Sequence, residues 1–369
     1  MLAGLPPVYG LYTSFYPVIV YAVLGTSKHF SFGTFAVMSL LSSATIEKNL
    51  PKRSEANISS TTLSPLHNET TSATTFGTTS TDNGSIPFPT FPSHGIVPSD
   101  DDIRVEIAVE FSLLVGVVMV GFGLLHLGFV ASYLSDQLVQ GMTTGAAVFV
   151  ILSQVPPLLG LEDIADDSST PLGIISTLKA IFTNIHNSNW VVCILSAVCI
   201  FILAVYKEQI DPRMKKHVCK YPVPVDLFIV IFATLASYLL KLNEKHDVPI
   251  VGSIPTGLRK PELPKTTYML KILPDAIITG VVNFSLAMSV SKIFASKHNY
   301  KIDSNQEWYA LGLGNFIGSF FKCHCAGASL SRSSVQEKGG STQLASIFSC
   351  LIVLLVLLVL AFLFKTLPK

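Results

Sequence analysis

Charged residues are scarce in this chain of 369 residues: they make up 13% of it, whereas 49% of the residues are hydrophobic. Soluble globular proteins carry about 25% charged residues. The composition therefore excludes an ordinary soluble domain and favours a protein with several membrane-spanning segments. The formal net charge is only +1, so a nucleic-acid partner is not expected.

Cysteines and catalytic clusters are sparse as well. The six cysteines are scattered through apolar runs and loops and do not form a disulfide framework. The triplet Cys323-His324-Cys325 offers too few ligands for a zinc site, so neither a metal nor another cofactor is expected. No nucleophile has an evident base partner. A membrane-embedded enzyme is therefore the weakest interpretation, and turnover of a lipid or phosphate ester would be needed to support it.

Long apolar runs are what the chain has instead. Because they are continuous rather than alternating, they predict helices and not barrel strands. Six runs approach the ~20 residues that cross a bilayer: Val105–Leu125, Tyr133–Val155, Trp190–Tyr206, Val223–Leu242, Ile272–Ala295 and Ala345–Phe364. A proline-bent helix is expected at Val8–Leu24, an interfacial helix at Pro171–Asn187 and a short glycine-rich span at Trp308–Phe321. The predicted fold class is an all-α polytopic membrane protein.

Residues 47–103 differ from the rest of the chain, because they are rich in Ser, Thr, Pro and Asn. This composition predicts a solvated loop without a packed core. The loop contains three glycosylation sequons, at Asn57, Asn68 and Asn83, which place it on the extracellular or luminal side. Three spans later a basic loop follows at Lys207–Lys220, on the side that the positive-inside rule makes cytoplasmic.

Two segments are too short to cross a bilayer. One runs from Thr34 to about Ile46, after turn-forming residues, and Thr34 is expected to cap it. The other runs from Ala326 to about Gly340. Paired short segments indicate a transporter built from inverted repeats, with its substrate at the midplane between half-helix N-termini. The alternative is that both are ordinary short or kinked helices in another kind of membrane protein.

Arg332 lies at the start of the second short segment, among small polar residues. A helix N-terminus at membrane depth leaves backbone N–H groups without partners and carries about half a positive charge. Arg332 adds a charge that does not titrate, and a buried arginine is costly enough to be kept mainly for function. These features predict an anionic substrate. The alternative is that Arg332 extends to lipid headgroups from a helix end.

Five motifs occur in order along the chain: LAGLPPVYGLY at Leu2–Tyr12, GTSKH at Gly25–His29, GTFAV at Gly33–Val37, NQE at Asn305–Glu307 and SLSRS at Ser329–Ser333. With them the chain resembles the sulfate permease (SulP) family of anion transporters, apart from residues 47–103. The resemblance implies fourteen membrane segments in two inverted repeats of seven, a core and a gate domain, a homodimer and a cytoplasmic STAS domain. It also implies that the third and tenth segments are half-helices whose N-termini hold the anion.

Carried over by motif, the substrate site would comprise Thr34 and Phe35 from the first half-helix and Ser329, Leu330, Ser331 and Arg332 from the second. Set against the family pattern, residues 1–46 would supply segments two and three, 47–103 the glycosylated loop, and 104–369 segments four to eleven. Most of the first segment, the last three segments and the STAS domain are expected to be absent, leaving about ten of fourteen segments.

Two departures from the family pattern concern mechanism. Gln140 stands where relatives often carry arginine, and the acid that proton-coupled members use in the eighth segment has no clear match in Ile272–Ala295. A proton relay would need such an acid, so proton–sulfate symport is not favoured. The expected function is exchange of sulfate, chloride, bicarbonate or a similar anion across the plasma membrane by alternating access. The alternative is an anion-binding, voltage-responsive motor or regulatory membrane protein with little turnover.

Overall fold

The computed structural model describes residues 3–51, 99–130, 136–161, 173–211, 213, 225–246, 248–252, 255, 257–340, 342–361 and 367–368. These residues are mostly helical. The first half of the chain contains α1 (Pro7–Thr13), α2 (Tyr16–Leu24), β1 (Phe32–Gly33), α3 (Ala36–Asn49), α4 (Asp100–Leu124), η2 (Leu127–Phe129), α6 (Asp136–Leu158) and α7 (Gly173–Asn184). The second half contains η4 (Ile185–Asn187), α8 (Trp190–Val205), η5 (Tyr206–Ile210), α10 (Val225–Leu240), α11 (Leu242–His246), α12 (Met269–Lys297), α13 (Ser304–Phe320), β2 (Gly327–Ala328), α14 (Leu330–Gly339), α15 (Leu344–Leu355) and η6 (Val356–Leu360).

Several helices have the length and composition of membrane spans. In the described part of the chain these are Pro7–Leu24, Asp100–Leu124, Trp190–Ile210 and Met269–Lys297. Shorter apolar helices occur at Val225–Leu240 and Leu344–Leu360. Together they identify an integral membrane protein, and they coincide with the apolar runs that the sequence predicted for these regions.

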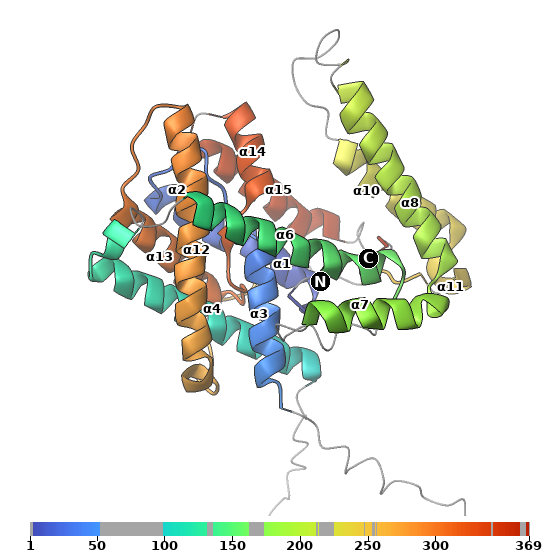
Figure 1. The fold of residues 1–369 in the computed structure, drawn as a ribbon, viewed down its shortest axis with the longest axis horizontal. Coiled ribbons are helices and arrows are strands. Elements are labelled where there is room, and N and C mark those ends of the chain that lie inside the picture. Colours follow the sequence, from blue (N-terminus) through green and yellow to red (C-terminus); the bar gives the residue numbers. More distant parts are fainter. Residues whose placement is uncertain are drawn as a thin grey trace, which may run out of the picture.

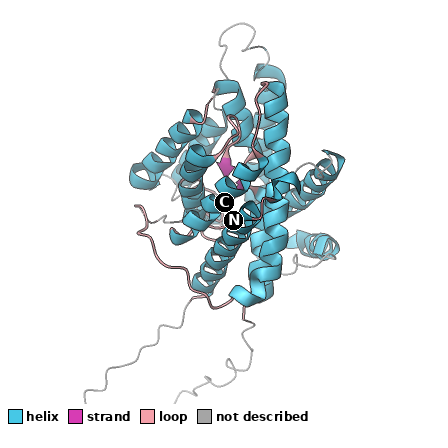
Figure 2. Cartoon of the chain, turned by 90° about the vertical axis from the view of Figure 1, so that its left-hand side faces the viewer, coloured by secondary structure: helices cyan, strands magenta, loops and turns pink. Residues whose placement is uncertain are grey.

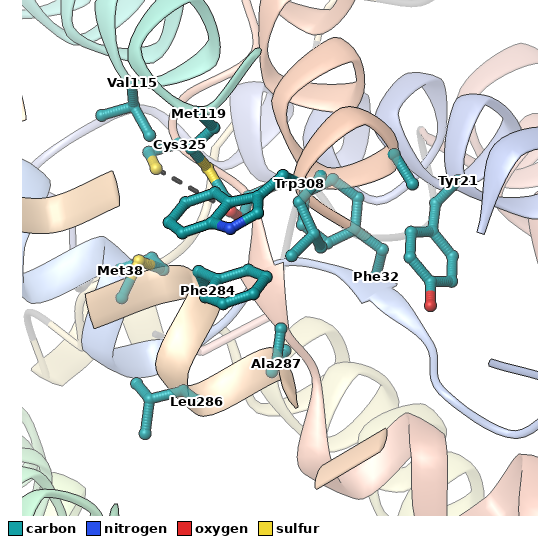
Figure 3. Close-up of a cluster of buried hydrophobic side chains, with 14 of the residues drawn as sticks. Tyr21, Phe32, Met38, Val115, Met119, Phe284, Leu286, Ala287, Trp308 and Cys325 are labelled. Atoms are coloured by element: carbon teal, nitrogen blue, oxygen red, sulfur yellow. Dashed lines mark hydrogen bonds between the residues drawn. The ribbon is translucent and has the colours of Figure 1, made fainter. Parts of the chain in front are cut away.

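Helices α2, α4, α12 and α13 pack together into the body that contains the main core (Figure 1). At its centre the rings of Phe284 on α12 and Trp308 on α13 are stacked, with centroids 3.6 Å apart and planes 7° from parallel, as Figure 3 shows. The glycines of α4 and α13 let these two helices touch: a Cβ on Gly116 would lie 2.5 Å from the backbone nitrogen of Phe316. This contact agrees with the close packing predicted for a glycine-rich span.

Helices α8 and α10 lie to one side of this body (Figure 1). Their apolar side chains are mostly exposed, including Trp190, with 77% of its surface accessible, and Phe201, with 68%. In α8 Val192 is buried, and in α10 Ser237 is buried. An apolar surface of this extent suits contact with lipid chains.

Some helix boundaries differ from the sequence prediction. Helix α4 begins at Asp100, not at Val105, because Ser99 and Asp102 form a reciprocal capping box that starts the helix in its acidic first turn. The proline-bent helix expected at Val8–Leu24 is divided into two helices, between Thr13 and Tyr16. Its break precedes Pro17, which occupies the first turn of α2, where a missing N–H costs nothing.

Two strands of two residues each, β1 and β2, pair antiparallel in the middle of the helices (Figure 2). Phe32 lies opposite Ala328, and Gly33 lies opposite Gly327. The sequence did not predict this sheet. It joins the two segments that are too short to span a membrane.

Candidate anion-binding site

The β1–β2 pair places the two short helices next to each other. Helix α3 begins three residues after Gly33, and α14 begins two residues after Ala328. The register is extended by one more hydrogen bond, in which the Ser329 backbone N–H donates to the Ser31 carbonyl at 3.0 Å. Both helices therefore start from the same small sheet, as the prediction of facing half-helices requires.

The N-terminus of α3 is not capped as expected. The helix starts at Ala36, with Phe35 at the N-cap position and no side-chain capping bond. The predicted cap, Thr34, instead has its Oγ1 3.2 Å from the Ser14 Oγ. Thr34 cannot reach the N–H groups of α3 because Phe35 intervenes in an extended conformation. The helix also continues past Ile46 to Asn49.

The Phe35 ring lies against the second short segment. A Cβ on Gly327 would meet the Phe35 Cδ1 at 3.3 Å, the Asn283 Oδ1 at 3.0 Å and the Met38 Cγ at 2.5 Å. Only glycine at position 327 leaves room for these groups. Phe35 therefore packs against Gly327 in β2, two residues before Ser329.

The second half-helix, α14, has the predicted end at Gly339–Gly340. Ser329 is at its N-cap, buried and without a side-chain capping bond. Leu330 and Ser331 are exposed. These residues and Arg332 occupy the first turn, where backbone N–H groups have no intrahelical partner.

The helices differ in whether a side chain caps their N-terminus, and α1, α2, α12 and α15 have no such cap. Helices α4, α8 and α13 are capped by Ser99, Asn189 and Asp303. Neither α3 nor α14 has such a bond. A cap would occupy the N–H groups that an anion needs, so two uncapped N-termini at one sheet suit an anion site.

The Arg332 side chain reaches between the two segments. Its Nη2 donates to the Ser349 Oγ on α15 at 3.1 Å, and its Nη1 would lie 2.8 Å from a Cβ on Gly33. Among the ion pairs of the described residues, none involves Arg332. Arg332 is therefore partly buried and held by Ser349, and no carboxylate in the part of the chain that the structure describes neutralises it.

A buried carboxylate holds the loop Gly25–Ser31, which leads into β1. Glu307 on α13 accepts hydrogen bonds from the Tyr21 hydroxyl at 2.9 Å, from the Thr26 N–H at 2.8 Å and hydroxyl at 2.5 Å, and from the Ser27 N–H at 3.2 Å. The sequence placed Glu307 in a motif but gave it no role. A carboxylate in an apolar helix next to serine- and threonine-containing turns is the signal that could have identified it.

Helices α14 and α15 hold the same loop from the other side. Ser333 accepts from the Ser31 N–H at 2.8 Å, and Gln336 donates to the Lys28 carbonyl at 3.0 Å. Gln343 Nε2 lies 2.6 Å from the Ser27 carbonyl and 2.8 Å from that of Phe30. These hydrogen bonds attach the loop to α14 and to the start of α15.

Two buried asparagines hold the start of β2. The Asn315 Oδ1 accepts from the Ala326 N–H at 2.7 Å, and the Asn283 Nδ2 donates to the Ala326 carbonyl at 2.8 Å. They come from α13 and α12, respectively. Hence the position of the α14 N-terminus depends on α12 and α13, and not only on the turn that ends α13.

Some predicted features lie outside the described residues, namely the sequons at Asn57, Asn68 and Asn83, and the side chain of Gln140. Cys323, His324 and Cys325 are buried. Within the described ranges, no group of three or more His, Cys, Asp or Glu side chains could hold a metal ion.

Comparison with known proteins gives consistent matches over the whole chain. A model of the sulfate permease family matches residues 1–369. Prestin of Danio rerio is 39% identical over 369 residues, covering 100% of this chain and 46% of the relative. Human solute carrier family 26 member 6 is 39% identical over 370 residues, covering 100% and 44%. The human sulfate transporter is 38% identical over 372 residues, covering 100% and 47%.

The chain spans about half the length of these curated relatives. Among solved structures, that of SLC26A9 superposes with a TM-score of 0.82 at 28% identity, covering 100% of this chain and 51% of the other. The transmembrane domain of the cyanobacterial bicarbonate transporter BicA superposes with a TM-score of 0.71 at 19% identity, covering 100% and 79%, which shows the fold alone. These likenesses confirm the predicted inverted-repeat membrane transporter fold with two half-helices.

Proposed function

The chain belongs to the sulfate permease family, and on that premise we propose that it carries an anion across a membrane, bound between the N-termini of α3 and α14. One observation supports this most directly: both N-termini start from the same two-stranded sheet, neither has a side-chain cap, and no carboxylate among the described residues pairs with Arg332 in the first turn of α14. Uncapped N–H groups, two helix dipoles and one fixed charge all favour a negative ligand.

The proposed roles follow from where each residue lies. Backbone N–H groups of both first turns and the Ser331 hydroxyl donate hydrogen bonds to the anion, and Arg332 supplies the positive field. Phe35 and Leu330 provide the apolar neighbours of the anion. Thr34 and Ser329 connect the strands to α3 and α14, respectively, and so fix where each helix N-terminus lies relative to the anion.

Transport by alternating access needs one body to move against another. We propose that α2, α3, α4, α12, α13 and α14 belong to the core domain, and that the α8–α10 layer belongs to the gate domain. The hydrogen bonds from loop Gly25–Ser31 to α13 and α14 support a rigid core. The murine solute carrier 26 family member A9, described as an anion transporter in the inward-facing state, superposes with a TM-score of 0.80 at 29% identity over 100% of this chain and 54% of that one.

The remaining assignments are proposals of the same kind. The loop 47–103 is extracellular and glycosylated at Asn57, Asn68 and Asn83, the protein resides in the plasma membrane, and the complete protein is a homodimer. Segments two and three precede this loop, and segments four to eleven follow it. The family is one of permeases, so no catalytic reaction is proposed.

Substitution of Arg332 in the full-length protein tests the site. Arg332→Gln should lower anion uptake into vesicles about 10- to 100-fold, the value of one or two charge-assisted hydrogen bonds. The amount of protein at the surface should stay unchanged. Lys338→Gln is the matched control, because it removes the same charge from the exposed last turn of α14 and should leave uptake unaffected. Undiminished uptake by Arg332→Gln would rule out the assignment of Arg332.

Competition among anions identifies the substrate. Uptake of sulfate, chloride, bicarbonate, oxalate and iodide should each be measured with the full-length protein, and the other four anions should then be added as competitors. The anion that is taken up and that competes most strongly is the preferred substrate, because selectivity depends on pocket size and on the desolvation of each anion. A wild-type protein that takes up none of the five would contradict the proposed function.

A further inference from the structure

Two side-chain hydrogen bonds connect α14 to α15, and one of them involves Arg332. The Arg332 Nη2 donates to the Ser349 Oγ at 3.1 Å, and the Ser346 Oγ donates to the Gln336 Oε1 at 2.7 Å. Arg332 and Gln336 are four residues apart on α14, while Ser346 and Ser349 are three apart on α15. Each pair therefore lies on one face of its helix. The two helices form a hairpin with these two bonds across it.

The two bonds differ in their surroundings. The Gln336–Ser346 bond is buried, lies nearer the turn of the hairpin, and its glutamine also donates to the Lys28 carbonyl. The Arg332–Ser349 bond lies at the other end of the hairpin, in the first turn of α14. The first bond therefore supports the fold, whereas the second acts on the only residue of the proposed site with a full charge.

The Ser349 contact restricts the direction of the guanidinium. Arginine has five N–H donors in a rigid planar fork. A hydrogen bond at one nitrogen and a close contact at another therefore fix the directions of the remaining N–H groups. Ser349 takes a donor on Nη2, and Gly33 lies against Nη1, where a Cβ would be only 2.8 Å away. The remaining N–H groups keep a defined direction relative to the first turn of α14.

Serine is a suitable partner for this purpose. Its hydroxyl accepts a hydrogen bond but carries no charge, so it orients the guanidinium without cancelling the field that attracts an anion. An aspartate or glutamate would orient it equally well but would neutralise it. Ser349 lies in an otherwise lipophilic helix, in the stretch Ser346-Ile347-Phe348-Ser349-Cys350.

We propose that Ser349 is a positioning residue of the anion site, acting through Arg332. The inference rests on the proposed function, and it adds α15 to the elements that determine anion affinity. Ser349 does not touch the anion itself. Its loss leaves the charge in place but lets the guanidinium sample other directions, so the affinity for the anion falls while the fold remains.

The test uses the full-length protein in vesicles and separates apparent affinity from maximal rate. Ser349→Ala should raise the KM for the transported anion about three- to tenfold, with a smaller change in maximal rate per molecule. Ser349→Thr retains the hydroxyl and should restore most of the affinity. Ser349→Asp should reduce uptake as severely as Arg332→Gln, because it pairs with the charge.

Ser346→Ala is the matched control on the same helix. It removes the other hairpin bond, so it should lower the melting temperature or the surface amount but leave the KM unchanged. The inference is overturned if Ser349→Ala has the wild-type KM, if Ser349→Thr is as impaired as Ser349→Ala, or if Ser346→Ala raises the KM equally. A wild-type protein without saturable anion uptake would instead remove the proposed function, and this inference with it.

Discussion

Gly33 is a residue at which the two short segments lie too close together for a side chain. Its φ is +154°, a value that residues with a Cβ rarely adopt, and a Cβ there would lie 2.8 Å from the Arg332 Nη1. The same residue pairs with Gly327 in the sheet. A hydrogen atom at this position therefore serves both the backbone conformation and the placement of the guanidinium.

We expect Gly33→Ala to reduce anion uptake and stability together. Displacement of the guanidinium should lower uptake several-fold, and backbone strain of about 1–3 kcal/mol should lower the melting temperature. Uptake and thermal unfolding of the full-length protein in detergent are the two measurements. Gly10→Ala is the control, since nothing lies within 4 Å of a Cβ at that helical position. Wild-type uptake by Gly33→Ala would show that Arg332 is not confined there.

At the residue scale, the sequence identified side chains whose chemistry is unusual for their surroundings. Arg332 could be found because a charge among small residues in an apolar chain needs a reason. Thr34 was wrong as a cap because capping depends on one residue of register, which composition does not determine. Ser349 could not be found, since a serine in a lipophilic helix has no distinguishing signal until its neighbour on another helix is known.

At the element scale, loop Gly25–Ser31 is the connection on which both half-helices depend. Glu307 is fully buried and accepts four hydrogen bonds, one from Tyr21 and the others from this loop. A carboxylate can accept all of them because it has two oxygens and about four lone-pair sites. The loop connects α2 to β1. Because Glu307 holds this loop, it also determines where β1 can lie.

Glu307→Gln should therefore destabilise the protein, although glutamine has nearly the same shape as glutamate. An amide nitrogen cannot accept a hydrogen bond, so at least one buried donor loses its partner, at a cost of about 1–3 kcal/mol or more. Thermal unfolding of the purified full-length protein should show the loss. Glu262→Gln breaks an exposed ion pair with Lys322 and should change the stability by less than about 1 kcal/mol. Equal melting temperatures for both variants would contradict the role of Glu307.

The sequence predicted the elements that contain a long apolar run and missed the two short strands. The long spans at α4, α8 and α12 were found from apolar length. The strands β1 and β2 contain two residues each, too few for any alternation to be visible. Their pairing joins positions almost three hundred residues apart, Phe32 and Ala328, and is set by packing of α12 and α13 around Ala326.

At the scale of the whole molecule, the inverted arrangement could be predicted because it leaves two breaks in corresponding places. The position of helices α8 and α10 relative to the body could not be predicted. These helices are apolar on nearly all sides, and a uniformly apolar helix gives no sign of which face meets protein and which meets lipid. The contact between the proposed core and gate domains is thus the part of the mechanism that the sequence shows least.

Movement of the whole body across the membrane field distinguishes transport from a voltage-responsive motor. One elementary charge moved through the full potential is worth about 2.3 kcal/mol per 100 mV. If the body carrying Arg332 moves with a bound monovalent anion, the two charges cancel, whereas the empty site moves as a cation. We therefore expect voltage-dependent charge movement that is small in a saturating monovalent anion and larger without anion. It should be abolished in Arg332→Gln measured without anion, and in the wild type it should be accompanied by tracer flux that saturates with anion concentration. Charge movement and flux should be recorded on the same cells expressing the full-length protein.

Large charge movement without measurable flux would favour the motor, and charge movement that survives in Arg332→Gln would show that other charges sense the field.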